Sequence, residues 1–66
     1  RPFVEAMLEK LEPRQRKILE LRFGLDGYDG PQRTFKEIGA VIGLTRERVR
    51  QLEKLALAAL QEMMDE

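Results

Sequence analysis

This 66-residue sequence contains no cysteine, no histidine, no serine and no tryptophan. Without cysteine there is no disulfide framework, and without cysteine or histidine there is no zinc site of the usual kind. No nucleophile–base pair of the common types can form, and no acidic pair stands where one pKa would be raised, so we expect no enzyme. The glycine-rich segment 24–30 lacks a following Lys-Ser/Thr, which excludes a P-loop. We therefore expect neither a cofactor nor a metal.

Long apolar runs are also missing. No stretch of eighteen apolar residues exists and no signal peptide is visible, so nothing in the sequence suggests a membrane or secretion. Sixty-six residues make one small domain with a modest core. The chain begins with Arg-Pro-Phe instead of Met, and we expect it to be a fragment of a longer protein.

An excess of charge of either sign is absent, because twelve basic residues balance twelve acidic ones. The charges are unevenly distributed. Segment 14–22 holds four basic residues against one acidic, and segment 45–54 holds four against two. Residues 55–66 carry three acidic residues and no basic one. Two basic segments on a neutral background indicate a module that contacts DNA weakly while something else holds it there.

The first half of the chain predicts two helices and a loop. Apolar residues in segment 3–11 follow the spacing of one helical face. Pro13 suits the first position of a second helix that runs to about Phe23, and Gly24 supplies its end. Apolar side chains project from two sides of this second helix, which predicts that it is sandwiched or exposes one side to a partner. Segment 24–33, with three glycines, is a loop by composition.

The second half predicts a helix-turn-helix. Thr34 and Glu37 form a capping box for a third helix, which Gly43 ends in the αL conformation. Thr45 caps a fourth helix that continues to Met63 or beyond. We expect Gly39 to lie where two helices cross closely. The remaining core positions are filled by Ile38, Ile42, Leu44, Val49 and Leu52.

The predicted fold is therefore all-α, a small four-helix domain that contains a helix-turn-helix. Its segments are the first two helices in 1–24, a loop in 25–33, the helix-turn-helix in 34–54 and the continuation of the last helix in 55–66.

The fourth helix offers base-reading side chains. At about 100° per residue, one face carries Arg46, Glu47, Arg50 and Gln51, and the opposite face carries Val49, Leu52, Ala56 and Leu60. Arginine can donate two hydrogen bonds to guanine, glutamine can pair with adenine, and glutamate can accept from cytosine. Arg48 is better placed for a phosphate. The alternative is a solvated face of alternating charge, but the preceding Gly-x-x-x-Gly and threonine cap favour DNA contact.

The string FKEIGAVIGLTRERVRQLEKLAL resembles region 4, the C-terminal domain of housekeeping-type bacterial sigma factors, and LEPRQRKILELRFGL resembles the first half of that region. The resemblance implies a cytoplasmic promoter-recognition subunit of RNA polymerase whose region 4 reads the minus-35 element. Carried over, Arg46, Glu47, Arg50 and Gln51 would read bases. The DNA backbone would be met by Arg14, Arg22, Arg48 and the segment Thr34, Phe35, Lys36, Glu37. The polymerase β-subunit flap would dock in an apolar groove formed by Ile18, Leu19, Leu21 and Phe23.

The tail departs from that family. Where members usually carry basic residues that meet activators, this chain has Leu55, Ala58, Ala59 and Gln61. Either the tail packs against the first helix, or Leu55 and Leu57 form an exposed apolar surface for a partner, such as an activator or an anti-sigma factor. Two alternative functions therefore stay open: a helix-turn-helix module whose main ligand is a protein, and a response-regulator output domain, which the Thr-Arg-Glu-Arg-x-Arg-Gln string fits poorly.

Overall fold

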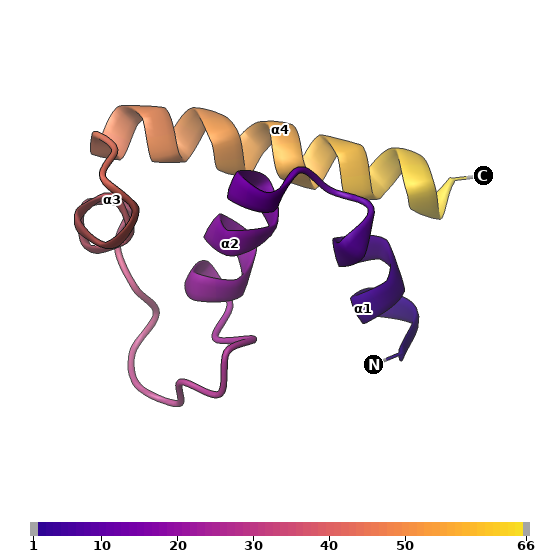
Figure 1. Ribbon diagram of the computed structural model, residues 1–66, viewed down its shortest axis with the longest axis horizontal. Coiled ribbons are helices and arrows are strands. Elements are labelled where there is room, and N and C mark those ends of the chain that lie inside the picture. Colours follow the sequence, from indigo (N-terminus) through magenta and orange to yellow (C-terminus); the bar gives the residue numbers. More distant parts are fainter. Residues whose placement is uncertain (1, 66) are drawn as a thin grey trace.

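The computed structural model describes residues 2–65, and the side chains of residues 5–65. Within that range the chain folds into four helices and no strand (Figure 1). They are α1 (Pro2–Glu9), α2 (Pro13–Arg22), α3 (Phe35–Ile42) and α4 (Arg46–Met64). The predicted all-α class with a helix-turn-helix is confirmed, and each of the last three helices begins or ends within a residue or two of its expected boundary.

Helix α4 is the element against which the others pack. Its 19 residues make it about 28 Å long at 1.5 Å per residue, and the longest extent of the molecule is 33 Å. Figure 1 shows α3 below the N-terminal end of α4, α2 below its middle and α1 towards its C-terminal half. The two ends of α4 therefore pack against different helices.

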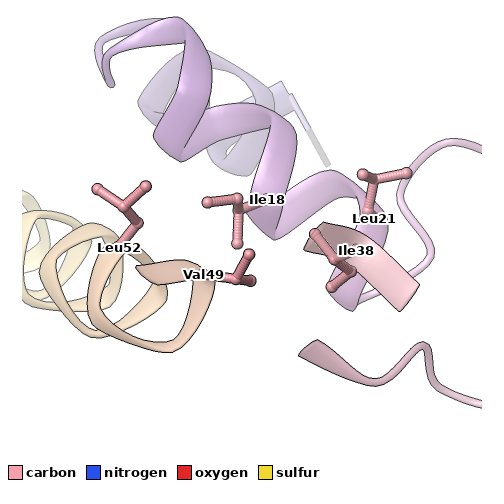
Figure 2. Close-up of a cluster of buried hydrophobic side chains, with 5 residues drawn as sticks. All are labelled: Ile18, Leu21, Ile38, Val49 and Leu52. Carbon is pink, nitrogen blue, oxygen red and sulfur yellow. The ribbon is translucent and has the colours of Figure 1, made fainter. Parts of the chain in front are cut away.

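One apolar cluster joins the three C-terminal helices. Figure 2 shows its side chains converging from α2, α3 and α4, and they are Ile18, Leu21, Ile38, Val49 and Leu52. Phe35, Ile42 and Leu44 pack against this cluster while staying partly exposed. Ile18, Ile38 and Val49 are completely buried. This cluster fixes the angle between the two helices of the helix-turn-helix.

A second apolar cluster holds α1 against the far half of α4. It consists of Leu8, Leu11, Leu19 and Ala56, with Ala59, Leu60 and Met63 packed around it. Leu19 faces this cluster, whereas Ile18 and Leu21 of the same helix face the first one. The prediction that α2 is sandwiched is thereby confirmed. The side chains of Phe3 and Val4, expected on the apolar face of α1, lie outside the described residues.

The loop between α2 and α3 is held by Arg33. Its guanidinium donates to the Leu21 carbonyl oxygen at 2.9 Å, forms an ion pair with Asp26 at 3.2 Å and lies 3.9 Å from the Tyr28 ring centroid. The hydrogen bond from Arg33 holds the pKa of the Asp26 carboxyl below its ordinary value. Composition predicted a loop here, but the contacts show one that is anchored to the end of α2.

No helix within residues 2–65 combines the length and the apolar character that crossing a bilayer requires.

Candidate nucleic-acid interface

The turn between α3 and α4 is closed by backbone hydrogen bonds to one carbonyl. The Gly39 carbonyl oxygen accepts from the Gly43 and Leu44 amides, at 2.8 and 2.9 Å. Gly43 adopts φ +79°, a left-handed conformation that costs glycine little. The αL end of α3 was predicted from the sequence and is confirmed.

Gly39 is required by the turn, which corrects the reason given from the sequence. A Cβ at this position would run into the Leu44 carbonyl oxygen, with the Leu44 and Thr45 carbonyl carbons close behind. The close approach therefore comes from the backbone of the turn folding over α3, and no atom of α4 beyond its cap residue is among these neighbours. The absent side chain lets the chain reverse within three residues.

Capping then sets the rotation of α4. The Thr45 hydroxyl oxygen accepts from the Arg48 amide at 3.2 Å, and α4 begins at Arg46. From that start, Val49 and Leu52 point into the first cluster. The four predicted base-reading side chains are all exposed on the outer side of the first two turns: Arg46, Glu47, Arg50 and Gln51.

Three of these four side chains contact one another. The Glu47 carboxylate accepts two hydrogen bonds from Arg50, Nε to Oε1 at 3.0 Å and Nη2 to Oε2 at 2.7 Å. Gln51 Nε2 also donates to Glu47 Oε2 at 3.4 Å, while Gln51 Oε1 accepts from Arg48 Nη1 at 3.4 Å. The hydrogen bond from Arg50 is the main reason that the pKa of Glu47 falls below its ordinary value. Sequence reasoning placed these residues on one face but gave no sign that they are joined.

Arg46 differs from its neighbours. Within residues 5–65 it takes part in no hydrogen bond or ion pair, and it lies exposed at the first position of α4. Its guanidinium is therefore available to an outside acceptor without breaking an internal contact.

A basic depression lies beside the candidate reading face, the exposed side of α4 that carries Arg46, Glu47, Arg50 and Gln51. Arg14 and Lys17 of α2 and Arg48 of α4 line it, together with Glu12, Pro13, Gln15, Ile42 and Leu52. The Arg14 and Lys17 side chains are both exposed. A phosphate strand that runs beside α4 would meet three cations and one carboxylate here, a net positive charge. Lys17 was seen in the sequence only as part of a basic segment, because its approach to Arg48 depends on how α2 packs against α4.

The residues at the start of α3 that were predicted to contact the DNA backbone differ in how far their side chains are engaged inside the structure. Thr34 and Glu37 are engaged in the capping box, with Thr34 N to Glu37 Oε1 at 2.7 Å and Glu37 N to Thr34 Oγ1 at 3.1 Å. The Phe35 ring is half-buried beneath the Arg22 guanidinium, 4.3 Å from its centroid. Lys36 is exposed and suits a phosphate best in this segment. These roles on DNA stay predictions.

Arg22 makes several contacts inside the structure, and the DNA-backbone contact expected from the sequence stays a prediction. Its guanidinium stacks on Phe35, pairs with Glu53 at 3.4 Å and donates to the Arg33 carbonyl oxygen. Only 21% of its side chain is exposed. The sequence could not show this, since Arg22 stands 31 positions from Glu53 and their proximity depends on the packing of α2 on α4.

The predicted apolar groove also needs correction. Ile18, Leu19 and Leu21 are buried in the two clusters and cannot line an open groove. Phe23 is 50% exposed at the end of α2. Leu55 and Leu57 are 54% and 41% exposed, although α4 packs against α1 through other residues. The tail thus combines both expectations: one side is packed and two leucines remain at the surface.

Comparisons with known proteins show what this chain is similar to. The family model described as "Sigma-70, region 4" matches residues 7–62. The chain is 49% identical over 65 residues to the RNA polymerase sigma factor sigF, chloroplastic, of Arabidopsis thaliana, which covers 98% of this chain and 12% of that protein. It is also 49% identical over 57 residues to the RNA polymerase sigma factor SigA of Nostoc sp. and to that of Synechocystis sp.. These matches cover 86% of this chain but only 14% and 13% of the two proteins. The chain thus spans about an eighth of the length of the curated relatives it matches.

Proposed function

Since the chain belongs to the sigma-70 region 4 family, we propose that it recognises promoter DNA as one domain of an RNA polymerase sigma factor. The observation that carries the proposal is the outer face of the first two turns of α4. Arg46, Glu47, Arg50 and Gln51 stand there together, exposed, on a helix whose rotation is fixed by the Thr45 cap and by buried Val49. A helix of this kind fits the DNA major groove.

Base reading and backbone contact are divided between two sets of side chains. The outer face of α4 reads base edges in the minus-35 element, while Arg14, Lys17 and Arg48 hold phosphates on one flank. Lys36 holds a phosphate at the start of α3. Phosphate contacts set the register of α4 in the groove, and the reading face then discriminates sequence. No residue is assigned a catalytic role.

Contact with polymerase uses a smaller apolar surface than the sequence suggested. Phe23 at the end of α2 remains available for the β-subunit flap, since the other three candidate residues are in the core. Leu55 and Leu57 remain available to an activator or an anti-sigma factor. Family membership favours promoter recognition over a response-regulator output domain and over a module whose main ligand is a protein.

The proposal predicts that reading and backbone residues respond differently to sequence and salt. We expect Arg46→Ala to weaken binding to a duplex with a minus-35 element by about 1–3 kcal/mol while changing binding to a random duplex little. Arg14→Ala should weaken both duplexes alike and reduce the salt slope by about 1. Fluorescence anisotropy at two salt concentrations measures both quantities. Equal losses on the two duplexes for Arg46→Ala would contradict base reading by α4.

A further inference from the structure

Glu47 and Arg50 form a connected unit on the reading face. Two N–H groups of Arg50, on Nε and Nη2, donate to the two carboxylate oxygens of Glu47 at 3.0 and 2.7 Å. Both residues stand on the same side of α4, three positions apart. A two-point contact of this kind fixes the plane of the guanidinium as well as its position.

The contact with Glu47 leaves one edge of the Arg50 guanidinium free to donate hydrogen bonds. A guanidinium has five N–H donors, and Glu47 occupies only the pair along the Nε–Nη2 edge. The remaining edge, between Nη1 and Nη2, still presents two parallel N–H groups. Those two groups match the O6 and N7 acceptors of a guanine. The ion pair and a guanine contact can therefore exist at the same time.

From this geometry we infer that Glu47 is a positioning residue, which holds Arg50 in the orientation that reads guanine. The inference rests on the proposed function and deepens it, because it gives Glu47 a task that differs from accepting a hydrogen bond from a cytosine. Without Glu47 the long Arg50 side chain samples many rotamers and loses that freedom only on binding. With Glu47 part of that ordering is already present in the free chain.

Two further observations support the inference. The Gln51 amide donates to the same carboxylate oxygen that accepts from Arg50 Nη2, so Glu47 is itself held from a second side. The hydrogen bond from Arg50 holds the pKa of Glu47 below its ordinary value, the direction that a direct contact with a guanidinium produces. Arg46, by contrast, makes no such contact within the described side chains and is not expected to depend on Glu47.

A double-mutant cycle on base preference tests the inference. The 66-residue chain and its Glu47→Ala, Arg50→Ala and doubly substituted variants are titrated with duplexes in which each base pair of the preferred site is replaced in turn. We expect Arg50→Ala to lose roughly tenfold preference at one base pair. Glu47→Ala should lose most of the preference at that same base pair, and the double variant should lose no more than Arg50→Ala alone.

Glu62→Gln serves as the matched control for the loss of one negative charge. Glu62 is exposed on α4, four turns beyond the pair. Its substitution should strengthen binding to all duplexes alike without changing any preference. Glu47→Gln, which keeps the size but not the charge, should instead lose preference at the Arg50 base pair.

A nuclear magnetic resonance measurement on the free chain gives a second, independent readout. The Arg50 Nε–H signal should exchange slowly with solvent in the unmodified chain and rapidly in Glu47→Gln. An unchanged exchange rate would overturn the inference, as would preference losses that fall at different base pairs and add in the double variant. In that second case the proposed function stands and Glu47 reads its own base. If the unmodified chain shows no preference among duplexes, the proposed function and the inference fall together.

Discussion

Gly39 shows how one missing side chain permits the turn on which the reading face depends. Because its neighbours on the Cβ side are backbone atoms of the turn, no rotamer change can make room for a larger residue. We expect Gly39→Val to lower the free energy of unfolding by about 1–3 kcal/mol, even though valine has the better helix propensity. Urea denaturation followed by circular dichroism measures the change.

Ala40→Val is the matched control, since Ala40 is the next residue of α3 and is exposed. Its substitution should cost only a few tenths of a kcal/mol, the difference in helix propensity. Similar stabilities for Gly39→Val and the unmodified chain would contradict the geometry of the turn described above.

At this scale the sequence predicted conformations better than contacts. Local rules identified the capping box of Thr34, the αL conformation of Gly43 and the cap at Thr45, because each depends on residues at most four positions apart. They could not place Arg22, whose partners Phe35 and Glu53 come from other elements. A charged residue in a basic segment looks the same from sequence whether it faces a phosphate or an internal carboxylate.

At the scale of elements, the two halves of α4 have different surroundings. Its first half supplies the reading face, and its second half closes the cluster around Leu8, Leu11, Leu19 and Ala56. The sequence left open whether the tail packs against the first helix or exposes Leu55 and Leu57 to a partner. Where α4 packs against α1, Ala56 and Leu60 are covered, whereas Leu55 and Leu57 stay at the surface.

The second half of α4 therefore predicts opposite outcomes for neighbouring substitutions. Replacing Leu55 and Leu57 together with lysine should change the thermal midpoint little, because 54% and 41% of these residues are already exposed. Replacing Ala56 with lysine should destabilise strongly, since its side chain is completely buried and a charge there has no partner. Differential scanning calorimetry of the two variants tests this. A large loss of stability in the double leucine variant would mean that the tail packs through those leucines after all.

At the scale of the whole molecule, basic side chains are unevenly distributed along α4. Basic side chains gather beside its N-terminal half, on Arg14, Lys17 and Arg48. Exposed acidic side chains lie there too, at Glu12 and Glu47, and a second group lies on α1 and around the C-terminal end of α4, at Glu5, Glu9, Glu62 and Asp65. The formal charges cancel to zero, so long-range attraction to DNA is weak although the local surface is suitable.

This balance predicts weak binding by the chain alone. We expect a Kd of about 10⁻⁴–10⁻⁶ M at physiological salt, the range typical of non-specific contacts. Joining the chain by a flexible linker to a second DNA-binding domain should raise the apparent affinity by about 10²–10⁴, because the tether raises the effective concentration. Titrations of the free and tethered forms on one duplex measure the ratio. Nanomolar binding by the untethered chain would contradict the prediction.

The division of the core into two clusters has a consequence for how the molecule opens. Helix α1 takes part only in the second cluster, whereas α3 takes part only in the first. Detachment of α1 would expose Leu19 and Ala56 yet leave Ile18, Ile38 and Val49 enclosed. Amide protons of α1 can therefore exchange with solvent through a local opening, whereas those of α3 exchange only when the whole domain unfolds. The packing of α2, α3 and the first half of α4 can therefore persist while α1 detaches.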